Sequence, residues 1–209
     1  APLGSRTKLT LPDGTLVWLN AGSRITYSQG FGVGNRKIEL IGEGYFEVKR
    51  NEEVPFLVKT NSLLVKVLGT KFNFRDYPDD AEAIVSLSEG KVALNNLLKK
   101  EKEAFLLPNE RVVLNKKNGR MHVEYSTVSN ALQWTNGYLF FDEELLPDVV
   151  KELERSYNVK IQIASDTLNT FRFYGNFVHR EQNIQEVLEA LSATRKIHYI
   201  IEGHNITLY

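Results

Sequence analysis

The side chains most able to do chemistry in this sequence are its histidines and its neighbouring carboxylates. Four histidines are scattered along the chain, and no two of them stand at the spacing of metal ligands. They are His122, His179, His198 and His204. Glu43 and Glu47 could be imagined as the carboxylate pair of a glycosidase, but both lie on or beside one expected strand and the sequence indicates no cleft. We therefore expect structural roles for these residues.

Two loops have some features of ligand-binding loops. Residues 30–34 read Gly-Phe-Gly-Val-Gly, but they lead into a strand, whereas a phosphate-binding loop requires a helix N-terminus after it. Four acidic residues around Pro78 lack the ligand spacing of a calcium loop and indicate a solvated turn: Asp76, Asp79, Asp80 and Glu82. The absence of cysteine excludes thiol catalysis and cysteine-based zinc sites. We expect no catalytic residue, no metal, no cofactor and no enzymatic activity.

The bulk composition narrows the class of protein. The chain has 209 residues, of which 42% are hydrophobic and 25% charged, as in ordinary globular proteins. Its 26 basic and 26 acidic residues cancel, which removes the basic footprint expected of a nucleic-acid-binding protein. No run approaches the ~18 apolar residues of a membrane span, and no signal peptide opens the chain. We expect a fragment whose targeting information lies upstream.

Residues 1–130 are predicted to form an all-β domain. Short runs rich in Val, Ile, Leu and aromatic residues alternate with turns of Gly, Asn, Asp or Pro. The expected strands are residues 7–11, 15–19, 24–27, 37–41, 45–49, 56–60, 63–68, 71–77, 83–88 and 91–94. The mixed-charge run at residues 99–103 indicates a solvated hairpin tip. This pattern fits a solenoid-like fold and a sandwich equally well.

Residues 131–209 are predicted to form a small α/β domain. Apolar residues at 3- and 4-residue steps from Leu145 to Tyr157 indicate a helix, which Asn158 can end in the left-handed conformation. A second helix is expected after Asn183, where Glu186 completes a capping-box spacing. With the strands around them, the order is βαβ–βαββ, with two helices packed on one sheet and right-handed crossovers. The fold class is α+β with two domains.

Four strings in the first domain resemble the FecR domain of anti-sigma regulators. They are residues 11–23 (LPDGTLVWLNAGS), 40–48 (LIGEGYFEV), 55–60 (PFLVKT) and 67–74 (VLGTKFNF). Residues 134–209 resemble the C-terminal domain attached to FecR domains in Bacteroidetes-type regulators, which is similar to the short secretin and TonB-receptor signalling module. The matching features are Trp134 and residues 137–139, 153–159, 174–177 and 187–191.

The resemblance implies a transmembrane signalling protein. FecR-type regulators cross the inner membrane once, and a cytoplasmic segment binds an extracytoplasmic-function sigma factor. Their periplasmic part meets the N-terminal signalling domain of an outer-membrane TonB-dependent transporter. This sequence resembles the periplasmic part alone, so we expect the membrane span upstream of it and no membrane insertion of this fragment.

The expected contact surface lies on strands of the second domain. Open sheet edges can accept a strand from a partner, and the candidate partner-binding residues are Tyr138, Phe140, Arg172 and Tyr174. An alternative is a glycan-binding or structural cell-envelope β-module, in which aromatic side chains stack on sugars: Trp18, Tyr27, Tyr45 and Trp134. A hydrolase has no supporting constellation.

Overall fold

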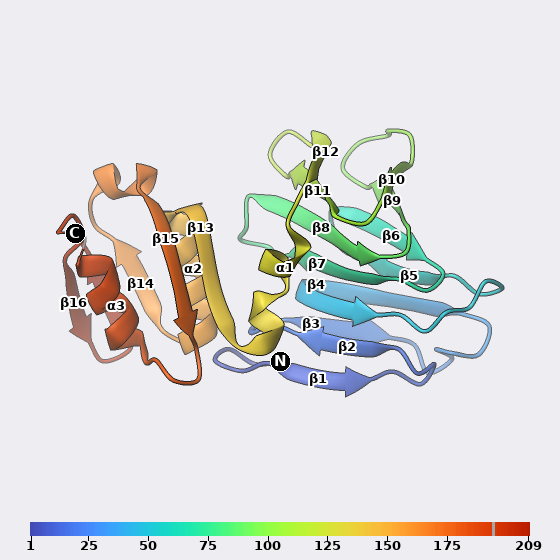
Figure 1. Cartoon of the computed structure of the whole chain (residues 1–209), viewed down its shortest axis with the longest axis horizontal. Helices are drawn as coiled ribbons and strands as arrows, with labels where there is room; N and C mark the ends of the chain where they lie inside the picture. The colour runs from blue at the N-terminus through green and yellow to red at the C-terminus, as the bar shows by residue number, and fades with distance from the viewer. Residues whose placement is uncertain (194) are drawn as a thin grey trace. The chain divides into compact units, whose positions relative to one another are not determined.

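The computed structural model describes residues 1–193 and 195–209 and divides them into two compact units (Figure 1). The first unit comprises Arg6–Leu132 with Ala1, and the second comprises Gln133–Tyr209 with the N-terminal residues Pro2–Ser5. Strands dominate the first unit, and helices pack on small sheets in the second. The α+β, two-domain layout expected from the sequence is confirmed. No helix within the described ranges is long and apolar enough to cross a membrane.

Twelve strands build the first unit. They are β1 (Thr7–Thr10), β2 (Leu16–Leu19), β3 (Arg24–Tyr27), β4 (Arg36–Glu47), β5 (Phe56–Lys59), β6 (Leu63–Val67), β7 (Lys71–Asp76), β8 (Glu82–Glu89), β9 (Val92–Asn96), β10 (Ala104–Leu106), β11 (Glu110–Asn115) and β12 (Met121–Tyr125). The first nine correspond to the expected strands, except that two expected strands are the halves of β4. The last three follow the final strand that the sequence pattern singled out.

Strand β4 belongs to two sheets at once. Its first half pairs with β3 and, in parallel, with β5, whereas its second half pairs with β2 and β7. Gly42 lies at the changeover with a φ of 98°, and a Cβ there would come within 2.5 Å of Ser23 Oγ. The glycines at 42 and 44 therefore allow a bend and close packing within one strand, so the expected division into strands at residues 37–41 and 45–49 is wrong.

The two sheets face each other across one hydrophobic core. Phe46 on the second half of β4 stacks on Phe72 of β7 with ring centroids 5.1 Å apart. Its ring also lies 6.3 Å from Phe56 of β5, in the opposite sheet. Inward side chains of both sheets, such as Val85 and Leu94, join the same buried cluster. This arrangement is a β-sandwich built from one twelve-stranded sheet that folds over at β4.

The first unit ends after the single-turn helix α1 (Val128–Ala131), and the second unit begins with the 3₁₀ turn η1 (Gln133–Asn136). The unit itself contains β13 (Tyr138–Leu145), α2 (Leu146–Tyr157), β14 (Lys160–Ile163), the 3₁₀ turn η2 (Asp166–Thr170), β15 (Arg172–Val178), α3 (Ile184–Ser192), β16 (Tyr199–Glu202) and β17 (Asn205–Leu208). The expected order βαβ–βαββ is confirmed.

The strands of this unit form two sheets, so the expected single sheet is wrong in this detail. β13 pairs antiparallel with β15, and the other sheet has the order β14-β17-β16, in which β14 runs parallel to β17. Helix α2 therefore connects strands of different sheets, and the right-handed crossover within one sheet does not occur. Pairing partners depend on contacts distant in sequence, which hydrophobic periodicity does not encode.

The helix ends agree with the sequence signals. Helix α2 has Pro147 in its first turn and ends at Asn158, which has a left-handed φ of 53°. At α3, the Glu186 backbone N–H donates to Asn183 Oδ1 at 3.1 Å, and the Asn183 backbone N–H donates to Glu186 Oε2 at 2.7 Å. This completes the predicted capping box.

Candidate partner-binding surface

The antiparallel pair formed by β13 and β15 has one buried face and one outer face. Leu139 and Phe141 on β13 point inward, as do Phe173 and Phe177 on β15. The residues between them therefore point outward, because side chains alternate along a strand. The four residues predicted as partner-binding, Tyr138, Phe140, Arg172 and Tyr174, all fall on this outer face. The exposed fraction is 38% for Tyr138 and 59% for Tyr174, and Phe140 is half-buried.

Three phenylalanine rings pack together on the inner face of the pair. The Phe173 and Phe177 rings are nearly parallel, and the Phe141 ring lies 6.3 Å from each of them. Gly175 sits between these two phenylalanines on β15, and a Cβ there would lie 2.6 Å from the Phe173 ring and 2.7 Å from the Phe177 ring. Glycine is thus needed at this position so that both rings can close over the backbone.

A β-bulge shapes one end of the outer face. The register of the pair shifts between Phe141 and Glu144, so Asp142 and Glu143 together oppose Tyr174. Glu143 adopts a left-handed φ of 56°, and its carbonyl oxygen accepts a hydrogen bond from Arg172 Nη1 at 2.6 Å. A hydrogen bond with the Glu143 carboxylate raises the pKa of the Tyr174 hydroxyl.

Two of the predicted residues, Arg172 and Tyr174, interact with Glu143, which the sequence analysis did not single out. Arg172 and Tyr174 meet at Glu143, while Tyr138 and Phe140 lie farther along β13. The acidic run after the alternating strand, residues 142–144, was the signal available in the sequence. It could not reveal the bulge, because a bulge is defined only by the register against the partner strand.

This outer face has the chemistry of a contact surface. Exposed tyrosines offer large area and a hydroxyl, and Arg172 adds a planar donor group beside them. The neighbouring carboxylates of Asp142 and Glu143 are exposed. Such a face can bind a protein partner through aromatic packing and charge.

The turn at residues 12–15 of the first unit has a structural role. Asp13 accepts hydrogen bonds from the Thr15 backbone N–H and from Arg36 Nε, at 2.9 and 2.8 Å. Arg36 also donates to the carbonyl oxygens of Lys49 and Val54. The hydrogen bonds of Asp13 and Arg36 therefore tie the turn at residues 12–15 to β4 and to the segment after it.

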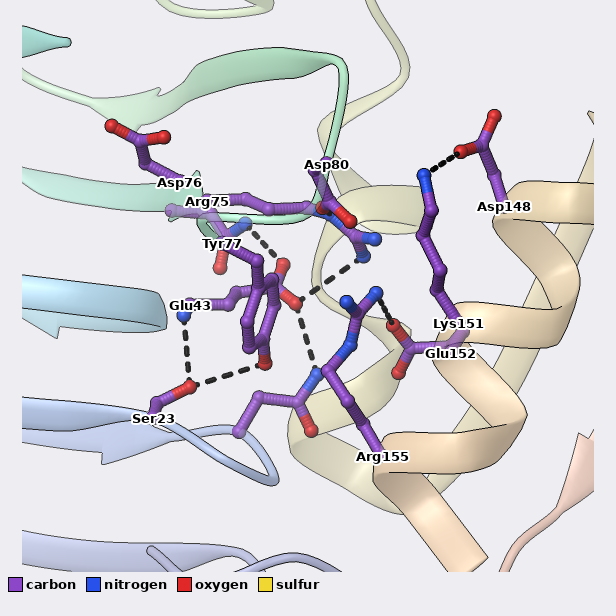
Figure 2. A network of polar contacts seen from close by, with 12 residues as sticks. Ser23, Glu43, Arg75, Asp76, Tyr77, Asp80, Asp148, Lys151, Glu152 and Arg155 are labelled. Atoms are coloured by element: carbon purple, nitrogen blue, oxygen red, sulfur yellow. Dashed lines mark hydrogen bonds and ion pairs between the residues drawn. The ribbon is translucent and has the colours of Figure 1, made fainter. Parts of the chain in front are cut away.

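A second buried network surrounds Glu43 (Figure 2). Its carboxylate accepts hydrogen bonds from Asn20 Nδ2 at 2.9 Å and from Asn73 Nδ2 at 2.8 Å. The Glu43 backbone N–H donates to Ser23 Oγ, which lies 3.1 Å from the Tyr77 hydroxyl. Each of these residues except Tyr77 belongs to one of the strings that resemble the FecR domain. Glu43 is held as a structural carboxylate, as expected.

The acidic turn around Pro78 is not fully solvated as expected. Asp76 and Asp80 are buried. Lys116 Nζ lies 2.7 Å from Asp76 Oδ1, and Arg75 Nε lies 2.8 Å from Asp80 Oδ2. The sequence pattern missed the Asp76 ion pair because Lys116 comes from the distant β11–β12 turn. Pairing with a cation permits burial of both carboxylates.

The aromatic residues of the glycan-binding alternative do not form one exposed platform. Trp134 and Tyr45 are buried, and Lys8 Nζ lies 4.4 Å from the centre of the half-buried Trp18 ring. Tyr27 is exposed but packs beside Phe31. Sugar stacking needs open aromatic faces, so these positions argue against that alternative.

The histidines remain separate from one another. His179 Nε2 lies 2.7 Å from the Ser156 carbonyl oxygen, and the His198 ring packs at 5.8 Å from Tyr209. In the part of the chain that the structure describes, no group of three or more His, Asp or Glu side chains could hold a metal ion.

A β-sandwich followed by a small two-sheet unit with an aromatic outer face defines the architecture of this chain. Comparison with known families identifies the chain further. The family described as FecR protein matches residues 2–93, and the family described as FecR, C-terminal matches residues 138–208. The chain belongs to the FecR family of anti-sigma regulators.

Solved structures have the same fold over the full chain. Two crystal structures of a candidate anti-sigma factor from Parabacteroides distasonis ATCC 8503, at 1.65 and 2.50 Å resolution, align with TM-scores of 0.91 and 0.90. Each is 34% identical to this sequence, and each alignment covers 100% of this chain and 96% of the other. No curated protein matches the chain.

Proposed function

We propose that this chain is the periplasmic signalling part of a membrane-anchored anti-sigma regulator. It binds the N-terminal signalling domain of an outer-membrane TonB-dependent transporter. A single span upstream of the chain carries the signal across the inner membrane, and a cytoplasmic segment passes it to an extracytoplasmic-function sigma factor. Membership of the FecR family supports this assignment.

The observation that carries the proposal is the outer face of β13 and β15. Tyr138 and Tyr174 expose their rings there, and Arg172 is held against the Glu143 carbonyl. Buried aromatic and arginine side chains dominate the binding energy of protein interfaces. We propose that Tyr138, Phe140, Arg172 and Tyr174 contact the transporter's signalling domain.

Calorimetric titration of this chain with the purified signalling domain of its cognate transporter tests the proposal. We expect 1:1 binding, and Tyr174→Ala weakens it about tenfold or more, as for an interface anchor. Tyr125→Ala is the matched control, because Tyr125 is an exposed tyrosine on β12 of the first unit. Absence of binding at several hundred micromolar, or equal loss in the two variants, would contradict the proposal.

A further inference from the structure

The two outer strands of the β14-β17-β16 sheet differ in whether a side chain occupies the backbone groups on their free edge. On β14, the Lys160 and Ala164 backbone N–H groups donate to β17 and its flank, so the Ile161 N–H points away from the sheet. That N–H donates to Glu154 Oε1 of α2 at 2.9 Å. A side chain thus blocks this edge against another strand, as natural proteins commonly arrange.

Strand β16 has no such block among the described residues. It pairs with β17 alone, and Figure 1 shows it at the rim of its sheet. Its sequence, Tyr-Ile-Ile-Glu, contains no lysine or proline, and its register against β17 has no bulge. The exposed fraction is 50% for Ile200 and 39% for Ile201. An exposed apolar strand edge without a blocking side chain favours pairing with another strand.

The hydrogen-bond phase of the β16–β17 pair identifies the groups on the open edge. His198 and Tyr209 exchange two backbone hydrogen bonds, at 2.9 and 3.0 Å. Antiparallel pairs alternate between bonded and non-bonded positions, so Ile200 also directs its backbone N–H and C=O toward β17. Tyr199 and Ile201 then direct theirs outward, and they supply two donors and two acceptors for a further strand.

The side chains of β16 complement those of a second, antiparallel β16 strand. We propose that β16 pairs antiparallel with β16 of a second copy of this chain, with the two-fold axis at Ile200. Tyr199 then lies opposite Ile201 of the second copy, and the two Ile200 side chains meet on the other face. His198 lies opposite Glu202 of the second copy at each end.

Other registers are disfavoured on the same grounds. Residues whose backbone N–H and C=O groups point outward, such as Tyr199 and Ile201, must lie opposite residues of the second copy whose groups also point outward. The register can therefore slip only in steps that keep these two residues in hydrogen-bonded positions. One such slip places Ile200 opposite Glu202, and the other places Ile200 opposite His198. Only the register centred on Ile200 matches apolar with apolar side chains and an acid with a base.

The contact is short, and this sets its strength. A pairing of about five residues on each side falls below the ~1,200 Å² buried by standard stable interfaces. The resulting dimer is therefore weak and reversible, with a dissociation constant on the order of 100 μM. It joins the two three-stranded sheets into one continuous sheet, and it is independent of the proposed binding of a transporter domain.

Sedimentation velocity of the 209-residue chain over roughly 10 to 1,000 μM tests the proposal at the level of mass. We expect a concentration-dependent shift from monomer to dimer. Ile200→Lys abolishes the shift, because it places two lysines against each other at the axis. Gln162→Lys, which adds the same charge on the blocked strand β14, leaves it unchanged. A monomer at all concentrations, or equal effects of the two variants, would overturn the proposal.

Charge exchange tests the register. His198→Glu alone weakens the dimer about tenfold or more, because it faces Glu202 of the second copy, and Glu202→Lys added to it restores the association. Amide hydrogen exchange followed by NMR gives an independent reading: the Tyr199 and Ile201 amides gain protection as concentration rises, while the Ile200 amide does not change. The sedimentation and charge-exchange tests use variants whose far-UV circular dichroism matches the parent, so loss of folding is distinguished from loss of pairing. Failure of the double variant to restore association, or protection elsewhere on the surface instead, contradicts this interface.

Discussion

Asp13 lies in the turn between β1 and β2, and its carboxylate meets the Arg36 guanidinium at the start of β4, with Asp13 Oδ2 2.8 Å from Arg36 Nε. Only 3% of the Arg36 side chain and 8% of the Asp13 side chain are exposed. The pair joins segments 23 residues apart, and the Arg36 guanidinium is also satisfied by two backbone carbonyls. The turn between β1 and β2 is thus tied to the first half of β4 by a buried ion pair.

Removing one partner of this pair should destabilise the first unit strongly. Asp13→Asn leaves the Arg36 charge buried without its counter-charge, and such changes cost about 3–5 kcal/mol. Urea denaturation followed by tryptophan fluorescence measures the free energy of unfolding. The control is Glu52→Gln, which removes the exposed Arg50–Glu52 ion pair and should change stability by less than about 1 kcal/mol. Equal, small effects of both substitutions would show that the Asp13–Arg36 ion pair is not important for stability.

Features encoded by short stretches of sequence could be predicted in this chain. The capping box at Asn183 and the helix end at Asn158 depend on one or a few neighbouring residues, and both occur where expected. The alternation along β13 and β15 predicts which residues of each strand lie on the same side of that strand. That the candidate contact residues share one face follows from the pairing of the two strands.

Features that depend on distant partners could not be predicted. The two-sheet layout of the second unit, the bulge at Glu143 and the burial of Asp76 each require knowledge of which strand or cation lies opposite. The continuous strand β4 was missed for a related reason. Gly42 indicates a turn when read locally, but its neighbour Ser23 comes from another part of the chain.

Gly175→Ala should destabilise the second unit by overpacking. The added methyl group would lie 2.6 Å from the Phe173 ring, and inserting atoms into a well-packed core typically costs about 1–3 kcal/mol. Gly30→Ala is a matched control, since the nearest atom to its Cβ would be Asn35 Nδ2 at an ordinary 3.6 Å. Thermal unfolding followed by near-ultraviolet circular dichroism measures both. A Gly175→Ala protein as stable as the control would mean that the two rings move aside without cost.

The Tyr174 hydroxyl should titrate above the ordinary tyrosine pKa of 10.0, because its hydrogen bond with the Glu143 carboxylate favours the protonated form. Glu143→Gln should lower this pKa toward 10.0, while Tyr45, whose pKa burial and Glu47 raise to about 12, should not respond. A raised folded-state pKa means that the hydrogen bond contributes fully below the unfolded value and is lost as pH rises through the folded value. NMR titration of the tyrosine ring carbons resolves the two residues, and an unchanged Tyr174 pKa in Glu143→Gln would show that the bulge carboxylate does not reach the hydroxyl.

Asn183→Ala should shorten or fray helix α3. The substitution removes the acceptor for the Glu186 N–H, and loss of an asparagine N-cap typically costs about 1 kcal/mol. Asn183→Ser keeps a good capping oxygen and should retain most of the stability, which separates capping from any other effect of the asparagine side chain. The free energy of unfolding and the exchange rates of the first-turn amides measure the change. Because Val187, Leu188 and Leu191 anchor the helix in the core of the second unit, the unit still folds and only its free energy of unfolding falls. Faster exchange confined to the first turn of α3 is the expected signature, and uniform acceleration over the whole unit would instead indicate that this helix start is needed for the unit to fold at all.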